Sequence, residues 1–293
     1  MRGVSFFRAK SSILKTNRFA PAAAGRTERS MKIIDAHAHI FPEKIAQRAC
    51  GSISDFYGGV PMAHAGTAEA LLASGAKAGV EKYLVFSTAT KPEQVESINR
   101  FIVGECEKHP EFIGLGTMHP GYAEYRSELE WLRKNGIRGI KLHPDFQKFC
   151  IDDAELYPLY ALLSEMGMFV LTHSGDDRYD YSHPARIARV AENFPHLRII
   201  AAHFGGWRQW DAAVEYLNLP NVYYDTSSTL SFAGQEVARK ALRILDSTHF
   251  FFGTDFPMWD HADELKRIQA LELPAGFLED ILYNNFYAFM KQK

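Results

Sequence analysis

Two histidines separated by one residue, His37 and His39, are the first candidates for chemistry in this sequence. They lie at the end of an apolar stretch that reads Ile33-Ile34-Asp35-Ala36-His37-Ala38-His39-Ile40. Residues two apart on a β-strand share a face, so the two imidazoles should point the same way. Ile34, Ala36 and Ile40 are expected on the opposite face, packed against helices. Two converging imidazoles form half of a metal site, because neutral histidine is the commonest metal ligand.

More metal-capable side chains follow the later apolar runs of the chain. In chain order they are His143, His173, His203, Asp225 and Asp255. A single histidine in such a place often caps a strand or satisfies a backbone group. That explanation does not account for five histidines that coincide with strand ends. The pattern therefore predicts a metal site at one rim of a sheet.

The elements that must position these residues alternate regularly along the chain. After the first strand, the strand-like runs are 82–86, 112–117, 138–142, 168–172, 198–202, 222–224 and 250–253. The segments with helical periodicity are 92–108, 124–135, 153–166, 184–193, 207–217 and 235–246. Eight strand–helix units predict an α/β fold, a (β/α)₈ TIM barrel with its site at the C-terminal strand ends. An open doubly wound sheet would need a glycine-rich nucleotide turn after an early strand, and none follows the first strand.

A long connection, 41–82, follows the first strand. It holds one helix-like stretch, 67–78, and a glycine-rich piece, 55–66. We expect this insertion between the first strand and the first barrel helix to lie over the active-site mouth.

Length and composition agree with one barrel domain over residues 31–293. The chain has 293 residues, 46% hydrophobic, and barrels of about 250 residues are common. A formal net charge of -2 gives no electrostatic reason to expect nucleic acid or an anionic membrane as a partner. No apolar run approaches the roughly 20 residues of a spanning helix. Cys50, Cys106 and Cys150 lie far apart, as is typical of a reduced, intracellular protein.

Residues 1–30 differ in composition from the rest of the chain. Basic residues stand among serines and alanines, and Glu28 is the one acid of the segment. We expect a flexible basic extension outside the fold. It is either an organellar transit peptide or the product of a start assigned too early, with Met31 the true start. A cytoplasmic location is expected, and an organellar one is the alternative.

Four motifs resemble those of the amidohydrolase superfamily. They are Asp35-Ala36-His37-Ala38-His39-Ile40-Phe41-Pro42, Thr172-His173-Ser174-Gly175, Ala202-His203-Phe204-Gly205-Gly206 and Phe252-Gly253-Thr254-Asp255-Phe256-Pro257. The resemblance covers about residue 31 to the C-terminus. It is strongest to the amidohydrolase-related branch that includes aminocarboxymuconate-semialdehyde decarboxylase and resorcylate-type decarboxylases.

This resemblance implies roles for five residues. His37, His39, His173 and Asp255 would be the metal ligands, and His203 the acid/base beside the metal. Asp255 could also receive a proton. Such a ligand set leaves a position for water, whose pKa a divalent ion can lower to about 7. We expect one divalent metal, zinc first and manganese second.

Lys141 allows three interpretations, since it shares a strand face with His143. It could be a carbamylated lysine that bridges two ions, a contact for a substrate carboxylate, or a buried cation paired with Asp35. The resemblance to a mononuclear branch favours one metal. His143 either faces substrate or caps the strand. Arg178 and Arg208, in later loops, either bind a substrate carboxylate or are solvated.

The sequence therefore predicts a metal-dependent hydrolase that acts on a small carboxylate-bearing molecule through an activated water. The alternatives are a non-oxidative decarboxylase of an aromatic or enoic acid and an inactive binding barrel. A homodimer is possible, because related barrels often pair.

Overall fold

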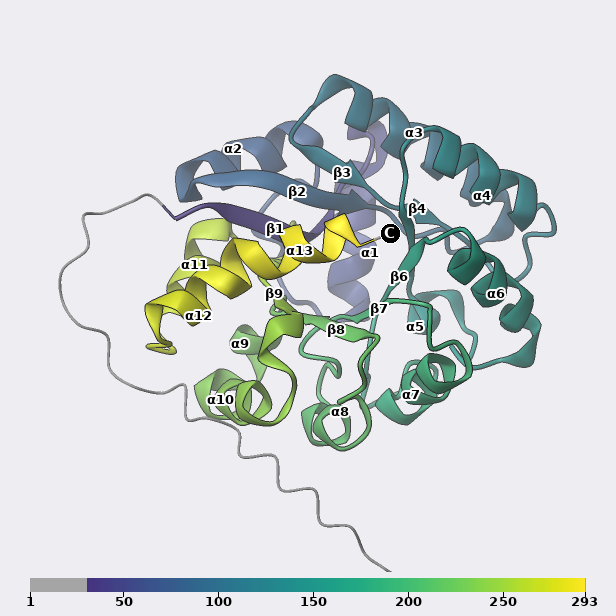
Figure 1. Ribbon diagram of the computed structural model, residues 1–293. Helices are drawn as coiled ribbons and strands as arrows, with labels where there is room; N and C mark the ends of the chain where they lie inside the picture. The colour runs from purple at the N-terminus through teal and green to yellow at the C-terminus, as the bar shows by residue number, and fades with distance from the viewer. Residues whose placement is uncertain (1–30, 293) are drawn as a thin grey trace, which may run out of the picture.

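The computed structural model describes residues 31–292. The expected extension, residues 1–30, lies outside this range. Within it, parallel strands alternate with helices, and the predicted barrel is confirmed (Figure 1). The strands are β1 (Ile33–His39), β2 (Val80–Phe86), β3 (Phe112–Gly114), β4 (Gly116–Thr117), β5 (Gly139–Leu142), β6 (Phe169–Thr172), β7 (Ile199–Ala201), β8 (Val222–Asp225) and β9 (Phe250–Phe251). β3 and β4 are the two halves of the predicted run 112–117, interrupted at Leu115, so the described chain has the eight expected strands.

Backbone hydrogen bonds close the strands into a barrel. The strands pair in parallel in the order β1-β2-β3 and β4-β5-β6-β7-β8-β9. The amide of Leu115 joins the two groups by donating to the carbonyl of Val85, 2.9 Å away. At the other seam the amide of Ala36 donates to the carbonyl of Phe252 at 2.8 Å, and that of Asp255 to His37 at 2.9 Å.

Gly253 permits the close approach of the chain at the second seam. A Cβ on this residue would stand 2.9 Å from the Cβ of His37, closer than packed carbons allow. The segment that follows β9 can therefore run directly beside the histidine strand.

The helices surround the strands, and the predicted ones lie where the periodicity placed them. They are α1 (Glu43–Phe56), α2 (Ala68–Ala78), α3 (Val95–Lys108), α4 (Tyr125–Lys134), α5 (Pro144–Gln147), α6 (Tyr157–Glu165), α7 (Pro184–Asn193), α8 (Trp210–Tyr216), α9 (Thr229–Phe232), α10 (Gly234–Ile244), α11 (His261–Gln269), α12 (Ala275–Glu279) and α13 (Asn285–Lys291). Short 3₁₀ turns precede α3, α6 and β9, at Pro92–Gln94, Ala154–Leu156 and Ser247–His249, and a π-helical turn, Asp280–Asn284, precedes α13. No helix of residues 31–292 has both the length and the apolar composition needed to cross a membrane.

Helix α1 was missed from the sequence. The predicted insertion contains the expected helix α2, which Thr67 caps by accepting a hydrogen bond from the amide of Ala70. It contains α1 as well. Ile45, Ala49, Ile53 and Phe56 recur at helical spacing, so a periodic signal was present and was overlooked. Only Ala46 and Cys50 of α1 are buried, so the buried stripe itself consists of small residues.

The barrel has two separate apolar cores, one inside the strands and one between strands and helices. The inner core includes Leu84, Phe169, Leu171 and Phe251. Phe286 and Phe289, both from α13, belong to the same cluster. Figure 1 shows α13, in yellow, lying across the barrel. The C-terminal helix therefore closes one end of the barrel interior.

One expectation about β1 was wrong. Ile34 and Ala36 belong to the inner core and do not face the helices, whereas Ala38 and Ile40 belong to the outer core. The register of β1 against β2 shifts between Asp35 and Ala38. Such a bulge reverses the alternation of side chains. Ala36 and the histidine pair consequently both face inward.

The packing of α13 gives a stability prediction. Phe289→Ala should lower the free energy of unfolding by about 3–5 kcal/mol, because it opens a cavity among the rings of the inner core. Tyr287→Ala, on the exposed side of the same helix (45% exposed), should change it by less than about 1 kcal/mol. Urea unfolding followed by circular dichroism measures both. Equal effects of the two substitutions would contradict the assigned packing.

Candidate metal centre

A small pocket lies where the C-terminal ends of the barrel strands meet. Its walls include His37, His39, Lys141, His143, His173, His203 and Asp255, and Ile53, Tyr57 and Met62 from the insertion close it above. The insertion therefore covers the mouth, as expected. The pocket volume is about 10 Å³, which is room for one water molecule or ion.

Three ligand atoms face one another in this pocket. The Nε2 atoms of His37 and His39 each lie 3.4 Å from Oδ1 of Asp255, and the three atoms are all within 4.8 Å of one another. Burial lowers the pKa of His39 to about 4. Burial also opposes the charge of Asp255, but the hydrogen bond with His39 and the field of His37 hold its pKa well below the ordinary value.

Neutral imidazoles and an ionised carboxylate are the protonation states that metal coordination requires. A pair of imidazole nitrogens with a carboxylate oxygen is a donor set that zinc and manganese accept. The residues present therefore fit a divalent ion.

Asp225 orients the first of these ligands. Its Oδ2 lies 2.8 Å from Nδ1 of His37, and its Oδ1 accepts a hydrogen bond from the amide of His203 at 3.1 Å. Burial raises the pKa of Asp225, but the charge and hydrogen bond of His37 outweigh it and bring the pKa to about 2. Because Nδ1 of His37 is bound to this carboxylate, its Nε2 is left to face the pocket.

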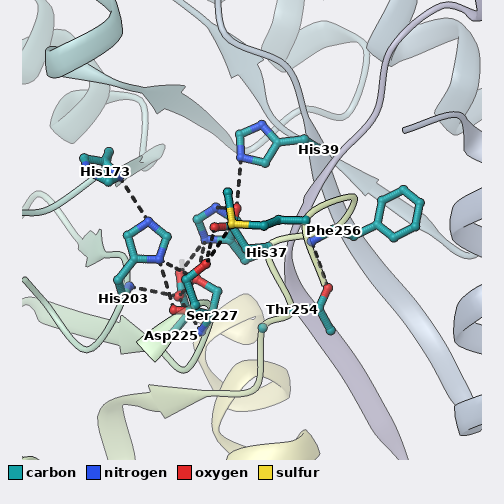
Figure 2. A network of polar contacts seen from close by, with 12 residues as sticks. His37, His39, His173, His203, Asp225, Ser227, Thr254 and Phe256 are labelled. Atoms are coloured by element: carbon teal, nitrogen blue, oxygen red, sulfur yellow. Dashed lines mark hydrogen bonds and ion pairs between the residues drawn. The ribbon is translucent and has the colours of Figure 1, made fainter. Parts of the chain in front are cut away.

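The tautomers of the next two histidines follow from their partners (Figure 2). Nδ1 of His203 lies 3.1 Å from the carbonyl oxygen of Ser227, so this nitrogen must carry the proton. Nε2 of His203 is then an acceptor, and it lies 3.0 Å from Nδ1 of His173. Burial lowers the pKa of His203 to about 4 and that of His173 well below its usual value.

The structure brings His173 to the pocket, though not into the group of three ligand atoms. Its Nε2 is buried, has no hydrogen-bond partner within residues 31–292, and lies 3.9 Å from Oδ2 of Asp145. Its role as a ligand stays a prediction.

Lys141 is fully buried beside the histidine strand. Its Nζ lies 3.4 Å from Nε2 of His37 and 4.8 Å from the ring centre of Phe86, and burial lowers its pKa to about 8. The proposed pairing with Asp35 is wrong, because that carboxylate points outward. It lies 3.0 Å from Nε2 of His261 and accepts a hydrogen bond from the hydroxyl of Thr254.

His143 both caps a helix and faces the pocket. Its Nδ1 accepts a hydrogen bond from the amide of Phe146 at the start of α5 (3.3 Å), and its Nε2 lies 3.1 Å from the hydroxyl of Tyr57. Its ring stacks on His173 with centres 4.1 Å apart. His143 is therefore a structural cap that also lines the pocket, and its contact with substrate stays a prediction.

Sequence reasoning missed Tyr57 and Asp145. Tyr57 follows the undetected helix α1. Asp145 is 3% exposed and accepts a hydrogen bond from Ser182 at 2.6 Å, and burial raises its pKa to about 7. Asp145 lies two residues after the strand-end residue His143, and this position could have identified it as a candidate site residue.

The structure does not bring Arg178 or Arg208 to the pocket. Arg178 donates to both oxygens of Asp176, at 2.9 and 2.7 Å, and to the carbonyl of Phe56 at the end of α1. Arg208 is exposed and lies 3.7 Å from the carboxylate of Asp177. Arg178 thus fastens α1 to the loop after β6.

Backbone strain is concentrated at the pocket. His203, Ser228 and Asp255 have φ angles of 61°, 56° and 60°, a region that residues with a side chain rarely occupy. Each such residue costs on the order of 1–3 kcal/mol and persists only where its surroundings hold it. The hydroxyl of Ser228 donates to Oδ2 of Asp255 at 2.6 Å, which helps to hold that carboxylate in place.

Comparison with known proteins follows this geometry. A family model described as Amidohydrolase matches residues 34–289. The fold is similar to that of a 5-carboxyvanillate decarboxylase from Sphingomonas paucimobilis, with 16% identity, a TM-score of 0.68 and coverage of 90% of this chain and 100% of that one. It is also similar to that of a dihydroxybenzoic acid decarboxylase from Polaromonas sp. JS666, whose structure holds manganese and the inhibitor 2-nitroresorcinol. The sequence identity is 14%, the TM-score is 0.70, and the match covers 89% of this chain and 97% of that one.

The fold is also similar to that of a hydrolase. A protein from Pseudomonas putida assigned as a 2-pyrone-4,6-dicarboxylic acid hydrolase gives 16% identity, a TM-score of 0.64 and coverage of 90% of this chain and 99% of that one. At these identities the likeness concerns the fold.

The contacts of Asp225 predict its effect on metal binding. Asp225→Asn keeps the shape of the side chain but removes the charge that orients His37. Metal affinity should fall by about 10- to 100-fold, as is typical of a lost partner of a metal ligand. Competition with a chelator, followed by metal analysis, measures the change. Asp211→Asn, at an exposed position, is the matched control, and an equal loss there would refute the assignment.

Proposed function

We propose that this chain, which belongs to the amidohydrolase family, is a metal-dependent hydrolase that acts on a small carboxylate-bearing molecule. The observation that carries the proposal is the convergence of His37, His39 and Asp255 on a pocket of water-molecule size, with His203 in its wall.

His37, His39 and Asp255 would hold one divalent ion, with His173 as the fourth ligand predicted from the sequence. Zinc is the first expectation. Manganese is the second, and the Polaromonas decarboxylase is a relative in fold that holds it. When bound, such an ion polarises substrate oxygens and lowers the pKa of water.

His203 is proposed as the general base. Its Nδ1 proton is fixed by the carbonyl of Ser227, so Nε2 is its basic nitrogen. This atom lies 3.0 Å from Nδ1 of His173, and it can accept a proton from the attacking water when that contact is given up. Because its pKa is about 4, the imidazole is neutral at pH 7 and ready to act as a base. Asp255 is the other possible proton acceptor.

Lys141 is proposed to bind the substrate carboxylate. With a pKa of about 8, its amine is mostly protonated at neutral pH. It is the buried cation of the pocket wall, and a charge-assisted contact in such surroundings is strong.

A non-oxidative decarboxylase of an aromatic or enoic acid is the second candidate, and the same lysine favours it. Decarboxylation needs a proton for the carbon that loses carbon dioxide. Burial lowers the pKa values of His39, His143, His173 and His203, whereas the Lys141 ammonium can supply that proton. Here the carbon–carboxylate bond breaks, its electron pair stays on carbon, and the ammonium protonates that carbon.

A substrate panel distinguishes the two reactions. Metal-loaded protein is incubated with lactones, amides and aromatic or enoic carboxylic acids, and release of acid and of carbon dioxide is followed in parallel. Acid release alone supports the hydrolase. Carbon dioxide release supports the decarboxylase. An inactive binding barrel would purify without stoichiometric metal and turn over nothing.

The proposed roles predict that substitution of a ligand histidine and substitution of His203 affect metal content differently. His37→Ala or His39→Ala should lower metal content and activity together, because nothing nearby replaces a lost ligand. His203→Asn should keep the metal, lose about 10²- to 10⁴-fold in rate, and lose the acidic limb of the pH–rate profile near pH 4. Metal analysis and kinetics measure both. Loss of metal from His203→Asn would make His203 a ligand and overturn its role.

Substitution of Lys141 tests how many metal ions the site holds. If the site holds one ion, Lys141→Ala should keep about one metal per chain while KM for a carboxylate substrate rises. If Lys141 is carbamylated, the variant should lose half of the metal, and bicarbonate should stimulate reconstitution of the wild type. Two tightly bound ions per wild-type chain would contradict the one-metal site.

A further inference from the structure

The two carboxylate oxygens of Asp255 have different surroundings. Oδ1 lies 3.4 Å from Nε2 of His37 and 3.4 Å from Nε2 of His39, so this oxygen faces both histidines. Oδ2 accepts a hydrogen bond from the hydroxyl of Ser228 at 2.6 Å. Rotation about the last side-chain bond of an aspartate exchanges its two oxygens, and this rotation is soft. A contact of the carboxylate must therefore determine which oxygen faces the histidines.

The direction of the hydrogen bonds around Ser228 follows from Trp259. The indole Nε1 of Trp259 lies 2.9 Å from Oγ of Ser228. An indole nitrogen can only donate, so Oγ accepts this bond and keeps its one proton for another acceptor. Among residues 31–292 its acceptors are Oδ2 of Asp255 at 2.6 Å and Sδ of Met258 at 3.8 Å. A carboxylate is a much stronger acceptor than a thioether, so the chain of hydrogen bonds runs from Trp259 through Ser228 to Asp255.

The ring of Trp259 is held by two neighbouring elements. Phe232 of α9 packs against it with ring centres 5.8 Å apart and planes at 76°. The guanidinium of Arg267 on α11 lies 5.2 Å from the ring centre, a cation–π contact. Arg267 is itself fixed by the buried carboxylate of Glu264 at 2.6 Å, which also accepts a hydrogen bond from Ser231. The N–H of Trp259 is therefore aimed at Ser228 by packing that lies outside the pocket.

The conformation of Ser228 is costly, and its hydroxyl is not used to cap a helix. Ser228 precedes α9 with a φ of 56° and is 2% exposed. Glycine adopts this conformation without strain, whereas a residue with a side chain does not. The side chain forms no capping hydrogen bond with α9. The contacts with Asp255 and Trp259 are therefore what a serine supplies here and a glycine would not.

We propose that Ser228 and Trp259 are positioning residues of the metal centre, which hold Oδ2 of Asp255 and thereby present Oδ1 as its ligand oxygen. The inference rests on the proposed function in one respect, since it takes Asp255 as a metal ligand. Carboxylates bind divalent ions through one oxygen or through both. With Oδ2 engaged by Ser228, Asp255 offers one oxygen.

The test uses Co²⁺ as the probe and the full chain. Competition with a chelator measures the affinity for Co²⁺. The visible absorption of the cobalt-loaded protein reports the number and arrangement of the ligand atoms, which a role in fold stability alone would leave unchanged.

Ser228→Gly removes the hydroxyl and also relieves the backbone strain. It should bind Co²⁺ about 10- to 100-fold more weakly, as is typical of a lost partner of a metal ligand. Its visible spectrum should change, because Oδ2 is then free to bind as well. Ser228→Ala should lose the same affinity but melt at a lower temperature than Ser228→Gly, because alanine is strained at this φ. Metal affinity should thus follow the hydroxyl, and the melting temperature should follow the backbone.

Trp259→Phe keeps an aromatic ring and removes only the N–H that directs Ser228. It should weaken Co²⁺ binding by about 2- to 10-fold, the effect of one neutral hydrogen bond. Trp131→Phe, on α4 and outside the pocket lining, is the matched control and should bind Co²⁺ like the wild type.

Three results would overturn the assignment of Ser228 and Trp259. They are a wild-type affinity and spectrum in Ser228→Gly, an affinity that follows the melting temperature from Ser228→Gly to Ser228→Ala, and equal losses in Trp259→Phe and Trp131→Phe. A wild-type chain that takes up no divalent ion would overturn the proposed function as well. Metal binding by the wild type together with unchanged Ser228 variants would contradict this inference alone.

Discussion

The buried carboxylate of Asp225 is the constraint on which the rest of the site depends. It stands at the end of β8, and it binds the ring of His37 on β1 and the backbone of His203 after β7. β1 is far in sequence from β7 and β8, so one side chain fixes the relative positions of the proposed ligand and the proposed base. Removal of a carboxylate from water is unfavourable unless it is fully paired. The pairing with His37 and the amides of His203 and Ser227 therefore determines both the tautomer of the histidine and the path of the backbone.

The backbone irregularities of the barrel also help to place the side chains of the pocket. A bulge in β1 turns His37 and His39 inward after Ala36 already faces inward. His203, Ser228 and Asp255 lie in the left-handed region, where side chains are directed differently from those of a regular strand. A barrel of uniform strands would fill its centre with apolar side chains. These local departures are what convert one end of that packed interior into a polar pocket.

The sequence predicted the barrel, its strand ends and the side chains that meet there, because apolar runs and their lengths are local properties. It failed where the signal is not local. The bulge in β1 comes from pairing with β2 and is invisible in the alternation of Ile34, Asp35 and Ala36. From the sequence, Arg178 is expected to be a solvated loop arginine. In the structure its guanidinium donates hydrogen bonds to Asp176, two residues earlier, and to the carbonyl of Phe56 at the end of α1. Asp35 was a candidate partner of Lys141 only under regular alternation, and its true partner, His261, lies 226 positions further along the chain.

Helix α1, which was not predicted from the sequence, contributes residues to both the small pocket and a second, larger cavity, which shares His39, Ile53 and Phe146 with it. Its buried face is two small residues, so the helix rests on the barrel through little apolar surface and is held at its end by Arg178 through the carbonyl of Phe56. Its other face lines the larger cavity, and Tyr57, just beyond it, lies over the small pocket. The proposed reaction centre and the larger cavity therefore lie on different parts of the fold. In the proposed function the strand ends would supply the metal ligands and the proton acceptors, whereas α1 and Tyr57 belong to an insertion that covers them. The strand-end side chains have to match a metal ion and a proton, which leaves little freedom in their type. The face of α1 that lines the larger cavity carries no such requirement, so its residues can vary without disturbing the strand-end side chains.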